Sequence, residues 1–143
     1  MKIALGADHG GFELKEKVKT HLIEKGYEVL DLGTNSTDSV DYPEFGHAVG
    51  HAVADKKAEF GIVICGTGIG ISIAANKVPG VRAALCTNTT MARLTREHNN
   101  ANILAMGGRI VGDVLALEMV DTFLGTEFQG GRHEKRINKI ESI

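Results

Sequence analysis

Hydrophobic positions along the chain follow two alternating patterns, short apolar runs and amphipathic repeats. The runs are typical of buried parallel strands and lie at 2–7, 27–32, 60–65, 81–86 and 101–106. The repeats between them are typical of helices, as with Leu14, Val18 and Leu22 before Gly26. Because parallel pairing needs crossover connections, the pattern predicts a three-layer αβα, Rossmann-like doubly wound sheet of about five parallel strands.

The later helices are predicted from the same repeat. We expect Met91 and Leu94 to point inward from a short helix over 88–97, and Ile137 and Ile140 to do so from a terminal helix. No repeat, linker or low-complexity tract interrupts the alternation. The 143 residues are therefore expected to form a single domain, 1–143.

Composition and charge exclude several classes of function. A formal net charge of -2 gives no general reason to expect nucleic acid or an anionic membrane as a partner. No apolar run reaches bilayer-spanning length, and the first residues lead directly into a strand rather than a secretion signal. Two cysteines do not make a disulfide framework and indicate a reducing compartment, so we expect a cytoplasmic protein.

The turn after the third strand is the most distinctive segment, and it reads Cys65-Gly66-Thr67-Gly68-Ile69-Gly70. Ligands bind at such strand ends in open α/β sheets. The glycines let backbone N–H groups approach an oxyanion, and the helix N-terminus behind them favours a thiolate at Cys65. A tight turn without a ligand is the alternative, although three flexible glycines cost entropy that such a turn does not require. A dinucleotide fingerprint is excluded because it needs glycines at positions 66, 68 and 71, and position 71 is Ile71.

Polar side chains near other strand ends have two explanations each. Asp8 and His9 offer a carboxylate and an imidazole for acid–base work or anion binding, but an Asx-type helix cap accounts for them about as well. A cap is also the alternative for His98 and Asn99. Cys86 lacks neighbouring glycines and is interpreted as a core residue. If its strand lies beside that of Cys65, the two thiols would be close enough to consider a disulfide.

Three arginines suit a phosphate group. Arg132 and Arg136 lie one helical turn apart after Gly130-Gly131, and Arg109 follows Gly107-Gly108. Guanidinium groups bind phosphate through charge-assisted hydrogen bonds, although a solvated basic helix explains the first two almost as well. The histidines and cysteines are too dispersed to predict a metal site.

Together these motifs resemble the B-type ribose-5-phosphate isomerases, within the wider family that includes the galactose-6-phosphate isomerase subunits. The resemblance extends from Lys2 to about Ile140. It rests on Asp8-His9-Gly10, Asp41-Tyr42-Pro43, Cys65-Gly-Thr67-Gly-Ile-Gly70, Ile73-Ala-Ala-Asn76-Lys77, His98-Asn99-Asn100-Ala-Asn102, Gly108-Arg109 and Gly131-Arg132-His133. It implies metal-independent interconversion of D-ribose 5-phosphate and D-ribulose 5-phosphate through a cis-enediolate, with no cofactor.

The resemblance also implies a role for each matching residue. Cys65 would be the proton-transfer base, and the enediolate oxygen would be held by the N–H groups of Gly66, Gly68 and Gly70. Three residues would assist opening of the sugar ring: Asp8, Thr67 and His98. Four would bind the phosphate: His9, Arg109, Arg132 and Arg136. Two would contact the sugar: Tyr42 and Asn99. One branch of the family uses a glutamate as base, and Ile71 at that position excludes its mechanism here.

The implied partners are a sugar-phosphate substrate and other copies of the chain, in a homodimer or homotetramer with active sites shared between subunits. Two alternative functions remain open. One is isomerisation of a six-carbon aldose 6-phosphate of the allose or galactose type, and the other is a sugar-phosphate sensor without activity. The segments around His98 and Arg132 favour the ribose branch, and the presence of Cys65 and Thr67 argues against a sensor.

Overall fold

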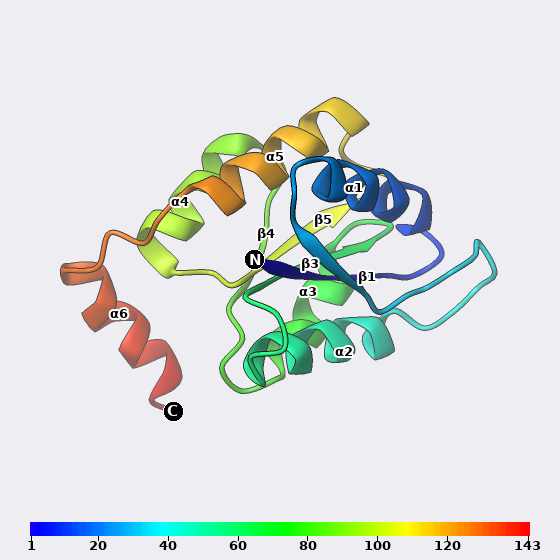
Figure 1. Cartoon of the computed structure of the whole chain (residues 1–143). Coiled ribbons are helices and arrows are strands. Elements are labelled where there is room, and N and C mark those ends of the chain that lie inside the picture. The colour runs from blue at the N-terminus through cyan, green and yellow to red at the C-terminus, as the bar shows by residue number, and fades with distance from the viewer.

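The computed structural model describes all 143 residues and contains one five-stranded sheet, shown in Figure 1. The strands are β1 (Lys2–Ala7), β2 (Glu28–Asp31), β3 (Phe60–Cys65), β4 (Ala83–Leu85) and β5 (Ile103–Gly107). All neighbouring pairs are parallel, in the order β2-β1-β3-β5-β4. This confirms the predicted parallel sheet. The fourth strand is shorter than the apolar run from which it was predicted.

Six helices accompany the sheet: α1 (Phe12–Glu24), α2 (Tyr42–Ala54), α3 (Ile69–Asn76), α4 (Thr89–Asn99), α5 (Asp113–Gly125) and α6 (Arg132–Glu141). One core cluster joins the sheet to α1, α4 and α5, and a second joins it to α2 and α3 on the opposite face. The result is the predicted three-layer αβα arrangement. None of the helices is both long and apolar enough to cross a membrane.

Alternation along β3 separates the two cysteines. Ile62 and Ile64 pack in the cluster under α1 and α5, whereas Val63 and Cys65 face α2 and α3. Cys86 belongs to the first cluster, and β5 lies between its strand and β3. The condition under which the two thiols would lie close together is therefore not met, because the crossover order inserts β5 between the two strands.

The prediction of side chains that point inward from the helices is wrong at two positions. Met91 is 40% exposed and Ile140 is 56% exposed, while Leu94 is half-buried. In α4 the buried side chains are instead Ala92, Thr95 and Arg96. The Arg96 guanidinium donates to the carbonyls of Thr126 and Ala101 and lies 4.7 Å from the centroid of the Phe60 ring. A charged side chain is thus buried in α4 with hydrogen bonds to backbone carbonyls, whereas Met91 stays exposed.

The interior also holds Lys15, which is fully buried in α1. Its ammonium lies 2.8 Å from both carboxylate oxygens of Asp31, and Lys19 contacts the same carboxylate at 3.0 Å. Burial alone would raise the pKa of Asp31, but hydrogen bonds from Lys15, the Gly33 N–H and Lys19 hold that pKa below its usual value. Asp31 therefore keeps its negative charge at the end of β2.

Asp31→Asn should lower the free energy of unfolding by about 3 kcal/mol, because it leaves the buried Lys15 ammonium with only the half-exposed Glu16 carboxylate, 3.2 Å away, as a counter-charge. The matched control is Glu28→Gln, which removes an exposed ion pair to Lys2 of 3.7 Å and should cost less than about 1 kcal/mol. Urea titrations of the two variants measure the difference. Equal losses would contradict a special contribution from the buried pair.

Candidate active site

Three loops meet at the carboxyl edge of the sheet, where β1, β3 and β5 end. The N–H of Gly108 donates to the Cys65 carbonyl at 2.8 Å, and the N–H of Arg109 donates to the Gly66 carbonyl at 2.9 Å. A Cβ on Gly108 would lie 2.6 Å from the Gly10 carbonyl oxygen, so only glycine permits this approach. The backbones of these three loops pack against each other. The side chains that follow the three strands therefore lie around one rim at the carboxyl edge of the sheet.

The Cys65 sulfur lies under the turn that begins α3. Its Sγ accepts a hydrogen bond from the Gly68 N–H at 3.1 Å, and the side chain is buried. Gly68 is the residue before α3 and has φ +81°, a conformation that L side chains rarely adopt. The helix N-terminus and this N–H therefore face the sulfur, and both stabilise negative charge there.

The rest of the glycine turn is flanked on two sides. The Tyr42 ring lies against Gly70, where a Cβ would come within 2.6 Å of the ring carbon Cε1. The Arg109 guanidinium lies over Gly66, with Nη1 at 3.3 Å from where a Cβ would stand. Thr67 is exposed between them, and its Oγ1 accepts from the Ile69 N–H. The turn thus presents backbone and a hydroxyl between an aromatic ring and a cation.

Asp8 and His9 follow β1 beside this turn. Oδ1 of the buried Asp8 accepts from the N–H groups of Gly10 at 2.9 Å and Gly11 at 3.2 Å, which is an Asx-type turn just before α1, while α1 itself has no side-chain cap. Nδ1 of His9 accepts from the Val40 N–H at 3.2 Å. In the neutral imidazole the proton therefore sits on Nε2, which leaves this nitrogen as a hydrogen-bond donor.

Two hollows open on either side of His9. The first, of about 280 Å³, is lined by charged side chains of three elements together with His9: Glu13, Lys17, Arg109 and Asp113. The second, of about 500 Å³, includes Asp8, Asp41, Tyr42 and His47. Both lie at the carboxyl edge of the sheet, where the topology predicts a ligand. No group of three or more His, Cys, Asp or Glu side chains is arranged to hold a metal ion.

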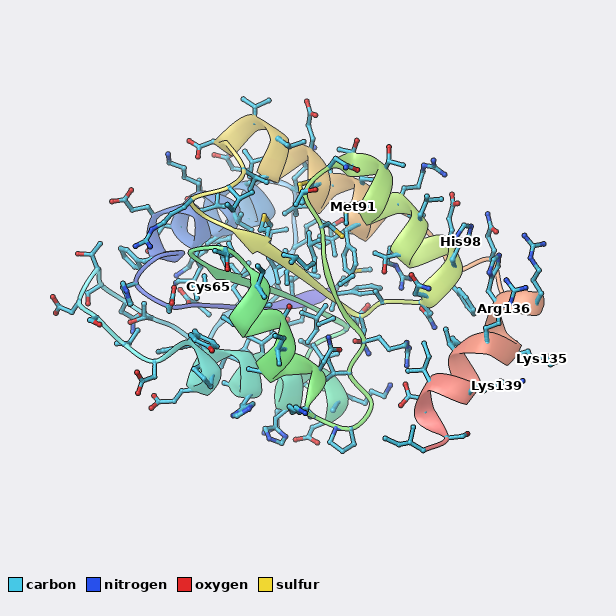
Figure 2. The ribbon with its side chains drawn as sticks, turned by 180° about the vertical axis from the view of Figure 1, so that it is seen from behind. Cys65, Met91, His98, Lys135, Arg136 and Lys139 are labelled. Carbon is cyan, nitrogen blue, oxygen red and sulfur yellow. The ribbon has the colours of Figure 1, made fainter.

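Four predicted site residues lie elsewhere. α4 runs back from the end of β4, so His98 and Asn99 come near the amino edge of the sheet, where the Asn99 carbonyl accepts from Arg82 just before β4. Arg132 and Arg136 lie on α6 next to this end of α4. Figure 2 shows Cys65 on one side of the molecule and His98 and Arg136 on the other. A single chain therefore does not bring the two groups together.

His133 joins α6 to the end of α4. Its ring stacks on His98 with centroids 4.4 Å apart and an interplanar angle of 16°. Burial, then His98, Arg132 and Arg136, lower the pKa of His133, and Glu97 opposes them. His133 therefore favours the neutral form. Its place in the Gly131-Arg132-His133 motif is the only signal in the sequence that could have drawn attention to it.

Comparisons with known proteins agree with one another. A family model described as Ribose/Galactose Isomerase matches residues 3–140. Ribose-5-phosphate isomerase B of Escherichia coli (strain K12) is 50% identical, over 99% of this chain and 95% of that protein. The structure of Clostridium thermocellum ribose-5-phosphate isomerase B is 60% identical with a TM-score of 0.99, covering 99% of this chain and 96% of that one. The Mycoplasma genitalium ribose-5-phosphate isomerase B with bound ribulose-5-phosphate is 44% identical with a TM-score of 0.95, covering 99% and 94%.

Iodoacetamide should label Cys65 well ahead of Cys86. Burial raises the pKa of the Cys86 thiol to about 11, whereas an N–H and a helix N-terminus face the Cys65 sulfur at the rim of the site. Mass spectrometry of the two tryptic peptides over time measures the order of labelling. A sugar phosphate bound at the rim should slow labelling of Cys65 alone, and faster labelling of Cys86 would contradict this account.

Proposed function

The chain belongs to the ribose/galactose isomerase family, and we propose that it interconverts D-ribose 5-phosphate and D-ribulose 5-phosphate. The observation that carries the proposal is the Cys65 sulfur, held by the Gly68 N–H below a turn of backbone donors. An aldose–ketose isomerase needs a base beside an oxyanion site, and this turn supplies both groups. Relatives named ribose-5-phosphate isomerase B over nearly the whole chain support the choice of sugar.

Cys65 acts as the base in the proposed proton transfer. Its thiolate removes the proton from C2 of the open-chain aldose, and the electron pair of that bond forms the C1–C2 double bond while the charge moves to O1. Backbone N–H groups of the turn 66–70 stabilise this cis-enediolate oxygen. The thiol then returns the proton to C1, and the hydroxyl proton passes from O2 to O1 as the C2 carbonyl forms. No group is gained or lost, so base, acid and oxyanion donors suffice.

Opening of the furanose ring precedes this transfer, and it needs a base at the anomeric hydroxyl and an acid at the ring oxygen. Asp8 uses one carboxylate oxygen for the N–H groups of Gly10 and Gly11, which fixes its orientation, and its other oxygen makes no hydrogen bond. Thr67 offers an exposed hydroxyl on the glycine turn. We assign both to ring opening together with His98.

The phosphate is assigned to His9 and Arg109 on one side and to Arg132 and Arg136 on the other. His9 offers its Nε2–H, and Arg109 lies over Gly66 with its side chain exposed. The α6 arginines are at the far edge of their own chain, so they would reach this phosphate from a second copy. His98 and Asn99 would arrive with them.

A second copy also suits the exposed apolar surface on α3 and α4. Ile69 and Ile73, which follow the glycine turn on α3, are 51% and 56% exposed, and Met91 on α4 is 40% exposed. Covering such side chains is a driving force for association. We therefore propose a homodimer, alone or as half of a tetramer, in which each active site takes Cys65 from one chain and α6 from the other.

Cys65→Ala should abolish isomerisation while the sugar phosphate still binds. Loss of an essential base typically lowers kcat by 10²-fold or more, and the alanine leaves the backbone N–H groups in place. The measurement is a coupled assay of ribose 5-phosphate conversion in the presence of EDTA, with allose 6-phosphate as the six-carbon comparison. Cys86→Ala is the matched control and should remain active. A fully active Cys65→Ala enzyme would overturn the assignment of the base.

Mixing two inactive variants tests whether the site is shared. Cys65→Ala and Arg132→Ala homodimers should each be impaired, but unfolding and refolding them together should restore about a quarter of the wild-type sites, because half the dimers are mixed and one of their two sites is intact. Sites built within one chain would restore nothing. Size-exclusion chromatography checks that mixed and parent species are assembled to the same extent.

A further inference from the structure

Helix α6 is weakly anchored to the rest of its own chain. Only His133 and Ile137 are buried in it, and the helix projects from the body of the molecule in Figure 1. The one side-chain hydrogen bond between α6 and another element is the 2.8 Å ion pair of Glu141 with Arg82. The orientation of α6 therefore depends on the His98–His133 stack near its start and on this ion pair near its end.

The Arg82 guanidinium links this ion pair to the turn after α4. Its Nε donates to the carbonyls of Asn99 and Asn100, each at 3.1 Å, and Nη2 donates again to Asn100 at 3.0 Å. Asn100 ends α4 in the left-handed conformation, with φ +46°. Its carbonyl therefore does not follow the helix axis, and it accepts from the Arg82 guanidinium. One guanidinium thus ties the end of α4 to the end of α6.

Arg82 is itself fixed by the sheet. Its N–H donates to the side-chain oxygen of Asn102 at 2.8 Å, and its carbonyl accepts from the Asn102 N–H at 2.9 Å. Its side chain is only 21% exposed, so the hydrogen bonds are partly shielded from water. This arrangement differs from a mobile surface ion pair, which usually contributes little to the stability of a protein.

We propose that Arg82 is a positioning residue that holds α6 against the end of α4, so that Arg132 and Arg136 reach the phosphate of the substrate. The inference rests on the proposed function. Without the anchor at Glu141, α6 is free to tilt about the His98–His133 stack near its start, and Arg136, one turn into the helix, moves with it. Even small displacements are costly where charged groups must meet a substrate.

The test compares Glu141→Gln and Arg82→Lys with Glu118→Gln, which removes an exposed carboxylate of α5 that has no ion pair. Glutamine keeps the size of Glu141 without its charge, and lysine keeps the charge of Arg82 without the planar fork. Both variants should raise KM for ribose 5-phosphate and Ki for inorganic phosphate about threefold or more, with kcat changed less than about twofold. Glu118→Gln should leave all three unchanged.

A purely structural role gives a different result, in which the active fraction and kcat fall while KM and Ki stay constant. That outcome, or unchanged KM and Ki in a folded Glu141→Gln protein, would overturn the inference. Absence of turnover in the wild-type protein would count against the proposed function instead. In that case hydrogen exchange would test whether the Glu141–Arg82 ion pair anchors α6. Faster exchange of the α6 amides in Glu141→Gln supports the anchoring, and unchanged exchange refutes it.

Discussion

The hydrogen bond from the Gly68 N–H to the Cys65 sulfur depends on backbone packing at the carboxyl edge of the sheet. Gly108 and Gly10 allow the loops after β5 and β1 to contact the Cys65 turn directly, and a side chain at either position would push the loops apart. The same contacts carry Asp8 and Arg109 to the rim of the turn. Close approach of three backbones therefore creates both the anion cradle and its surrounding charges.

The sequence predicts this edge well because the signals are local. The apolar run that ends at Cys65 and the glycines after it occupy consecutive positions, and β3 covers the same residues in the structure. The order of the strands depends instead on crossovers between distant segments. The sequence pattern left open whether the strand of Cys86 adjoins that of Cys65, and the structure places β5 between them.

The burial of charged side chains could not be predicted from the sequence either. Lys15 and Arg96 occupy positions where hydrophobic periodicity alone gives no reason to expect burial, and each is accommodated by acceptors distant in sequence, Asp31 for Lys15 and the Thr126 carbonyl for Arg96. Such partners become visible only when the elements are placed in space. Met91 was predicted to be buried for the converse reason, since helical spacing does not distinguish a surface that packs within the chain from one that remains exposed in it.

The parallel sheet also explains why the candidate site divides into two groups. Each helix after a strand returns the chain to the amino edge, so residues at the end of α4 are carried away from the carboxyl edge, where Cys65 lies. The positive charges of α6 that suit this helix to bind phosphate also affect His133 on the same helix. Arg132 and Arg136 help to lower the pKa of His133. A neutral His133 places no positive charge against the stacked His98 ring. The charge that would bind the phosphate thus also favours a ring stack that joins α6 to α4.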